Sequence, residues 1–141
     1  MSRLAVDFLD QGLHRVLFDA MPLPVFVVDK DVNVLECNTA AARLFGQGER
    51  TRKQPRAGDI LHCLHTTESP EGCGGASACS DCGLRAAVRA ASQGRSVTRQ
   101  AAELDLIQKG KPTKVNLRIS CQPFTYEKSS FVLLVLEGLN S

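Results

Sequence analysis

Hydrophobic residues in the first twenty positions recur at the spacing of one helical face. They are separated by Asp, Gln, His and Arg, and they comprise Leu4, Phe8, Leu9, Leu13, Val16, Leu17 and Ala20. Apolar positions three and four residues apart line one side of an α-helix. We therefore predict an amphipathic helix over residues 4–20, which ends in the proline-containing run 21–24 because proline cannot continue a helix.

Short apolar runs, typical of strands, follow this helix. Residues 25–28 have the pattern of a buried strand, 29–31 that of a tight turn, and 32–37 that of the second strand of a hairpin. Asn38 is a residue type that commonly caps helices, and Gly46 stands where a helix commonly ends. The pattern predicts a hairpin that leads into a short helix over residues 39–45.

A longer helix is indicated by apolar residues at i, i+3, i+4 and i+7, which are Leu84, Ala87, Val88 and Ala91. Ser80 or Asp81 would cap its start, and Gly94 follows its end. The period then changes to two, in residues 102–106 and again in 115–121, with a turn at Gly110. We expect a connection over 123–130 and then a central strand over 131–136, because that run is apolar without interruption.

The order of these elements predicts the fold class. A helix, two strands, short helices with an irregular loop, a longer helix and three strands favour an α+β fold. We expect one antiparallel five-stranded sheet with the helices mainly over one face.

Length and charge narrow the class of protein. The chain has 141 residues, is 43% hydrophobic and 23% charged, and carries a formal charge of +2, as expected for one globular domain. This charge is too small to imply a nucleic-acid or anionic-membrane partner, and the basic loop 47–56 is expected to be a solvated connection. Asp7 and Asp10 interrupt the N-terminal apolar stretch, so we expect no export signal, no membrane contact, a cytoplasmic location and reduced thiols.

Residues 17–45 and 133–140 resemble the PAS domain. The first segment is similar to the entry helix, first strand and turn of that family, followed by a second strand that runs into an Asn-capped helix; the second is similar to its closing strand. The resemblance implies an N-terminal amphipathic helix over 1–22, suited to dimerisation or signalling, and a PAS sensory domain over 23–141 with a cysteine-rich segment at 59–83. It also implies a regulatory module that controls an output module or kinase and is not itself an enzyme. No flavin is expected, since the Asn-Cys-Arg-Phe segment of light-sensing relatives is absent.

Cysteine is the one unusual residue type. Four of the six cysteines form the pattern C-x9-C-x5-C-x2-C, at Cys63, Cys73, Cys79 and Cys82. The last two flank the start of the longer helix, where unpaired backbone N–H groups and the helix dipole favour thiolate. Four thiolates suit a single centre of either zinc or an iron–sulfur cluster.

Two histidines and two further cysteines complete the candidate residues. His62 and His65 flank Cys63, and either could replace a thiolate or hydrogen-bond a bound sulfur in the second shell. Cys37 closes a strand and Cys121 lies on an alternating strand, so we assign both to the core. Two disulfides, or four inert thiols, are the alternatives to a metal.

The cysteine segment also resembles a bacterial PAS subgroup. Its pattern is Cys-x-His, then Glu-Ser-Pro-x-Gly-Cys-Gly, then Cys-x-x-Cys, and the segment is similar to oxygen-sensing PAS domains that hold an iron–sulfur cluster. This implies redox or oxygen sensing through the four-cysteine centre. One alternative is a homodimerising interaction module, paired through residues 4–20, with a structural zinc or disulfide site. Another is a small-molecule receptor with its pocket between sheet and helices.

Overall fold

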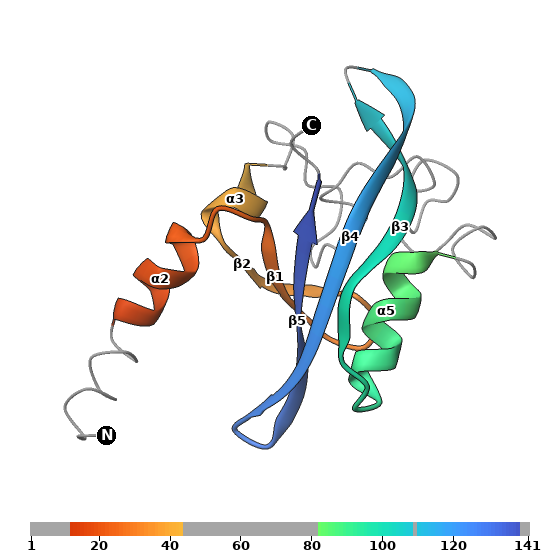
Figure 1. Cartoon of the computed structure of the whole chain (residues 1–141). Coiled ribbons are helices and arrows are strands. Elements are labelled where there is room, and N and C mark those ends of the chain that lie inside the picture. Colours follow the sequence, from red (N-terminus) through yellow and green to blue (C-terminus); the bar gives the residue numbers. More distant parts are fainter. Residues whose placement is uncertain (1–11, 44–81, 109, 139–141) are drawn as a thin grey trace.

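The computed structural model describes residues 12–43, 82–108 and 110–138. In chain order the elements are α2 His14–Ala20, β1 Val25–Val28, β2 Val34–Cys37, α3 Thr39–Ala42, α5 Gly83–Ser92, β3 Val97–Gln108, β4 Lys111–Tyr126 and β5 Ser129–Glu137. Within these ranges the strands form one five-stranded sheet in the order β2-β1-β5-β4-β3, and every neighbouring pair is antiparallel. Helix α5 packs against β3, β4 and β5 (Figure 1). The predicted α+β fold is confirmed.

Strand β5 is central, as its unbroken apolar run predicts. It pairs with β1 on one side and β4 on the other. Leu134 lies directly opposite Phe26 of β1 and Cys121 of β4. These three side chains are buried in the core. On the opposite face, Leu133 and Val135 are only partly buried. The run is continuously apolar because both faces of β5 carry hydrophobic side chains.

Helix α5 supplies the other half of the core. Its buried residues are Leu84, Ala87, Val88 and Ala91, the set that the periodicity predicts. Gly94 has a φ of +95° and its N–H donates to the Ala91 carbonyl, which ends the helix as expected. The N-cap is Cys82, where the sequence favoured Ser80 or Asp81: the backbone of Cys82 is extended and its carbonyl accepts the N–H of Ala86.

The β1–β2 turn is longer than predicted, because β2 begins at Val34 and not at residue 32. The Asp29 carboxylate accepts the backbone N–H groups of Asp31 and Asn33 at 2.9 and 3.0 Å. Val32 adopts a left-handed φ of 67°, yet its side chain is buried in the core. Left-handed backbone is unfavourable for a β-branched residue, so burial of the Val32 side chain offsets this strain.

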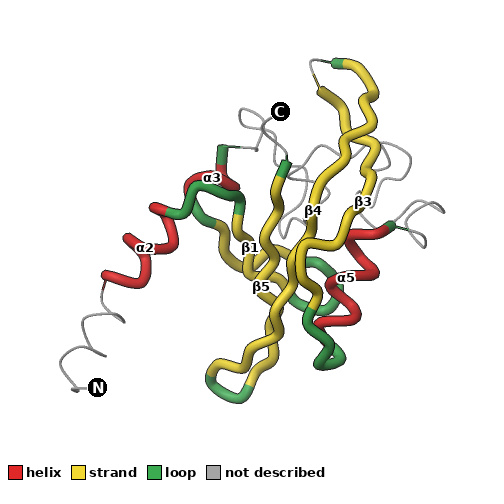
Figure 2. The backbone as a smooth tube through the Cα atoms, viewed as in Figure 1, coloured by secondary structure: helices red, strands yellow, loops and turns green. Residues whose placement is uncertain are grey.

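The predicted connection over 123–130 is wrong. Strand β4 continues to Tyr126 and β5 begins at Ser129, so Glu127 and Lys128 alone form the turn (Figure 2). Both have positive φ, 49° and 68°, as a type I′ hairpin turn requires. Cys121 is the last β4 residue that pairs with β3. Pro123 lies two residues further on, so its missing N–H leaves no β3 carbonyl without a donor.

The N-terminal helix is confirmed over its last two turns as α2, which ends at the extended residue Met21. Residues 1–11 of the predicted helix lie outside the described residues, as do residues 44–56. Helix α2 buries none of its side chains and extends away from the sheet beside α3 (Figure 1). None of the described helices is long and apolar enough to cross a lipid bilayer.

Candidate functional site

Cys82 is the one predicted metal ligand among the described residues. It occupies the N-cap of α5, where its side chain makes no capping hydrogen bond. The residue is half-buried and packs against the hydrophobic core. Cys82 thus lies at the start of a ten-residue helix, where the sequence places it.

The other candidates, Cys63, Cys73, Cys79, His62 and His65, lie outside the described residues. Among the residues that are described, no three His, Cys, Asp or Glu side chains are grouped as metal ligands. Since this set includes only one of the four predicted thiolates, convergence of the four stays a prediction.

Arg85 adds a positive charge near Cys82. It lies in the first turn of α5, and its Nη1 atom is buried without a hydrogen-bond partner among the described residues. Buried polar atoms are normally hydrogen-bonded, so this nitrogen is an exception in a side chain that is otherwise partly exposed. Its spacing of three residues from Cys82 was visible in the sequence, but its burial was not.

The two remaining cysteines lie in the sheet. Cys121 is 1% exposed, and burial raises the pKa of its thiol to about 12. Cys37 ends β2 and is half-buried against the core. Both positions agree with the core assignment made from the sequence.

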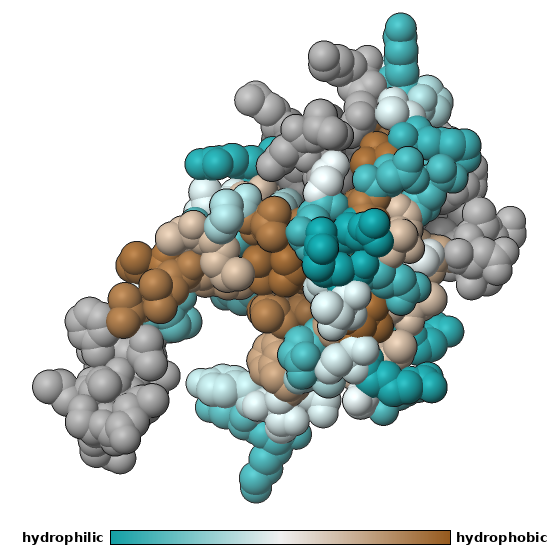
Figure 3. Space-filling model, in the orientation of Figure 1, coloured by the Kyte–Doolittle hydropathy of each residue, from teal (hydrophilic) through white to brown (hydrophobic). Residues whose placement is uncertain are grey.

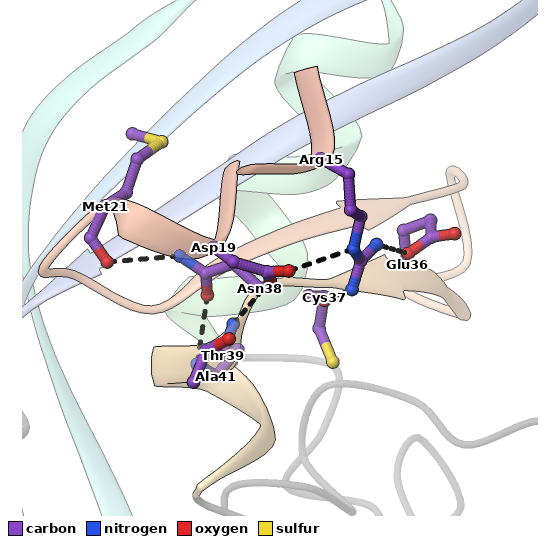
Figure 4. Close-up of polar contacts among 8 residues, drawn as sticks. All are labelled: Arg15, Asp19, Met21, Glu36, Cys37, Asn38, Thr39 and Ala41. Carbon is purple, nitrogen blue, oxygen red and sulfur yellow. Dashed lines mark hydrogen bonds and ion pairs between the residues drawn. The ribbon is translucent and has the colours of Figure 1, made fainter. Parts of the chain in front are cut away.

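A buried amide connects the start of the sheet to α3 (Figure 4). The Asn38 Oδ1 accepts from the backbone N–H of Ala41 at 3.0 Å, which is the predicted helix cap, and also from that of Val25. The Nδ2 group donates to the carbonyls of Leu23 and Met21, at 2.9 and 3.5 Å. Asn38 therefore holds the α2–β1 connection, β1 and α3 together.

Arg15 joins α2 to β2 (Figure 4). Its guanidinium donates to the carboxylates of Asp19 and Glu36 and to the carbonyl of Cys37. The hydrogen bond to Glu36 is the main cause that raises the pKa of Arg15, and both partners are largely exposed. Asp19 in turn accepts the backbone N–H of Thr39 at 3.0 Å. These long-range contacts could not be predicted from local sequence.

Large apolar side chains on and beside α2 remain exposed. The exposed fraction is 62% for Val16, 55% for Leu17 and 40% for Met21, and Leu35 on β2 is 44% exposed. Figure 3 shows brown, hydrophobic surface over the helix that extends from the domain at the left. A cluster of this kind marks a surface suited to another protein chain.

A cleft of about 580 Å³ lies between the β1–β2 turn, the C-terminal end of α5 and the β4–β5 hairpin. Its lining includes Asp31, Ser92 and Phe124. Because these groups are acidic, hydroxylic and aromatic, the cleft does not specify one class of ligand.

Comparison with known families finds one match, over part of the chain. Residues 12–76 match the family model for the PAS domain. No curated protein matches the chain.

Solved PAS domains share the fold at low sequence identity. The PAS domain of nitrogen regulation protein NR(II) from Vibrio parahaemolyticus aligns with a TM-score of 0.50 and 14% identity, over 91% of this chain and 99% of that one. The PAS domain of an HTR-like protein from Haloarcula marismortui gives 0.50 and 17%, over 91% and 96%. A PAS domain from a two-component sensor histidine kinase gives 0.51 and 12%, over 93% and 97%. The match over residues 12–76 and the shared fold together show that this chain is similar to PAS domains.

Proposed function

We propose that this PAS domain senses redox state or oxygen through a metal centre held by Cys63, Cys73, Cys79 and Cys82. In this proposal the domain regulates an attached or partner output module, such as a kinase. One observation carries it: the last cysteine of the pattern, Cys82, forms the N-cap of α5 and packs against the core.

Helix α5 connects this cysteine to the sheet. Its buried face contacts β3, β4 and the central strand β5. Because protein interiors are close-packed, a shift at the first turn of α5 must be absorbed by the strands beneath it. A change in the bonding of Cys82 would therefore alter the packing of β5, which ends at Glu137.

The described residues near Cys82 fit a thiolate-bound metal. Four thiolates carry more negative charge than one Zn²⁺ neutralises, and an iron–sulfur centre with four cysteines is likewise anionic. The N-terminus of α5 and the positive charge of Arg85 in its first turn both favour an anion at this end of the helix. Zinc would hold the segment in one structure, whereas an iron–sulfur cluster would add electron transfer; His62 and His65 would act in the second shell.

Purification without oxygen tests this proposal. Iron with sulfide and a visible absorption band would support an oxygen or redox sensor, and zinc would support a structural or thiol-based site. Replacing Cys79 with Ser should abolish metal uptake and leave the sheet folded. The matched control is Cys37→Ala, at a cysteine outside the pattern, which should retain the metal. Metal-free wild-type protein with a normal fold, or with two disulfides, would contradict the proposal.

A second candidate function is a homodimerising interaction module. It is supported by the exposed side chains of Val16, Leu17 and Met21, on a helix that buries none of its own residues. Pairing of α2 with a second copy would remove this apolar surface from water.

Sedimentation analysis of the whole chain tests the dimer. Leu17→Glu places a charge in the apolar cluster and should shift the protein to monomer. Gln93→Glu adds the same charge at the exposed end of α5 and should leave the dimer intact. A wild-type monomer at high concentration would rule out this function.

A further inference from the structure

A cleft of about 610 Å³ lies at the end of β5, and its volume is in the range of small-molecule sites. Arg118 and Glu137 form the last pair between β4 and β5, whereas β3 and β4 continue past it (Figure 1). Ala101 of β3 pairs with Arg118 on the other side, so three strands present one row of side chains here. The neighbouring residues Leu117 and Leu136 are buried in the core with α5, so the row lies on the opposite face of the sheet.

Arg99 reaches this row from a strained position. A bulge shifts the register of β3 between Val97 and Gln100, and Arg99 within it has a left-handed φ of 46°. Such backbone is unfavourable for residues other than glycine, and it persists where the surrounding structure holds it. Here the Ser120 hydroxyl accepts the Arg99 N–H at 2.9 Å, and the Arg99 Nε donates to the Glu137 carboxylate at 3.0 Å. The bulge therefore directs the Arg99 side chain across β4 to the end of β5.

Arg118 is a cation of the cleft that has no carboxylate partner among the residues that the structure describes. Glu137, directly opposite, is bound by Arg99, and Glu103 lies 3.7 Å from Lys114. The hydrogen bond that Arg118 makes, from Nη1 to the Arg99 carbonyl, is 3.5 Å long. Because a guanidinium carries several N–H donors in a planar fork, most donors of Arg118 have no acceptor within the described part of the chain.

We propose that this cleft binds a small organic acid with two carboxylates, one paired with Arg118 and the other with Arg99. A carboxylate fits the planar fork of an arginine and accepts two parallel hydrogen bonds from it. Arg99 donates to Glu137 through Nε, which leaves its terminal nitrogens for a ligand. The small residues Ala101 and Gly138 also line the cleft and leave room for the carbon chain of the acid. The site shares no residue with the metal centre proposed above and does not depend on it.

A titration with succinate tests the site. We expect succinate, added to the isotope-labelled whole chain, to shift the backbone amide signals of Ala101, Arg118 and Gly138 until they saturate. Succinamide has the same carbon chain without the charges and should leave these signals unchanged. Inorganic phosphate should bind more weakly, because one small ion cannot pair with both arginines across a cleft of this volume. Equal shifts with succinamide, tighter binding of phosphate, or no saturable shift with succinate would overturn the proposal.

Variants of exposed arginines locate the binding. Arg118→Gln should weaken succinate binding about 10-fold or more, because a pair of charge-assisted hydrogen bonds is lost. Arg118→Lys keeps the charge without the planar fork and should recover part of the affinity. The matched control is Arg89→Gln, at an exposed arginine of α5 outside the cleft, which should bind succinate as the wild type does. Wild-type affinity in Arg118→Gln would overturn the proposal.

Arg99→Gly separates a role in ligand binding from a role in folding. Glycine adopts left-handed backbone without strain, so this variant should melt at the same temperature as the wild type or above it. It should nevertheless bind succinate more weakly, because the second guanidinium is lost. A lower melting temperature together with unchanged binding would show that Arg99 serves the fold alone and would overturn its role in the cleft.

Discussion

The side-chain oxygen of Asn38 accepts the backbone N–H of Val25 at 3.0 Å, although thirteen residues separate them along the chain. The backbone N–H of Asn38 in turn donates to the backbone carbonyl of Val25, also at 3.0 Å. Since Asn38 is completely buried, water cannot replace these bonds. One amide side chain thus fixes the first residue of β1 and also caps α3.

Asn38→Ala should destabilise the domain by about 2–4 kcal/mol. Loss of the cap costs about 1 kcal/mol, and leaving the Val25 N–H and the Leu23 carbonyl buried without partners costs about 1–3 kcal/mol more. Urea unfolding of the variant measures this change. Asn116→Ala, at an exposed asparagine of β4, should be nearly neutral. A loss of less than about 1 kcal/mol for Asn38→Ala would show that other groups replace its bonds.

The contacts of Arg15 should hold α2 only weakly. Helix α2 buries no side chain, and both members of the Arg15–Glu36 pair are about half exposed. A double-mutant cycle with Arg15→Gln and Glu36→Gln should give a coupling of about 0.2–1 kcal/mol, smaller in 1 M salt. Hydrogen exchange of the α2 amides should speed up in Arg15→Gln and stay unchanged in Arg43→Gln. Unchanged exchange in Arg15→Gln would show that apolar contacts hold the helix.

Cys121 should resist alkylation in the folded protein. Its thiol is buried, and its pKa of about 12 leaves almost no thiolate at pH 8. Iodoacetamide labelling followed by mass spectrometry should modify Cys121 only after unfolding. Labelling of native protein at the rate of a model thiol would contradict the burial of this strand.

The same thiol makes stability fall at high pH. Burial raises the pKa of Cys121 from 9.0 to about 12, so above pH 9 the unfolded chain loses a proton that the folded protein keeps. The stabilisation that comes from keeping the Cys121 thiol protonated is fully present below pH 9 and is lost as the pH rises toward 12. Cys121→Val should flatten this part of the curve of unfolding free energy against pH. An equally steep decline in the variant would assign it to other groups.

Gly138 directly follows β5 and has a backbone conformation that other residues avoid. Its φ is +105°, and a Cβ there would lie 3.2 Å from the carbonyl oxygen of Asn116. Gly138→Ala should therefore cost about 1–3 kcal/mol. Gly94 has a similar φ of +95° but open space around the missing Cβ, so Gly94→Ala should cost less, about 1 kcal/mol. Equal losses in urea unfolding would show that the close contact at Gly138 relaxes freely.

Local periodicity was enough to predict most of the sheet and its covering helix. The buried face of α5 and the alternation of β4 follow from residues close together in sequence, because helices and strands each repeat at a constant period. Asn38 was predictable as a cap for the same reason: its bond to Ala41 spans three residues. Glu127 and Lys128 were missed because neither is a typical residue of a type I′ turn, and pairing between the two strands imposes that turn.

The cysteine pattern and the candidate metal chemistry came from the sequence alone, since ligand spacing is a property of the chain. Only the tertiary structure showed that Val32 is buried in a left-handed turn, that Arg15 reaches Glu36, and that the Nη1 atom of Arg85 is buried without a hydrogen-bond partner among the described residues. Burial and contacts between distant residues depend on how the sheet and helices pack, and local patterns do not specify that packing.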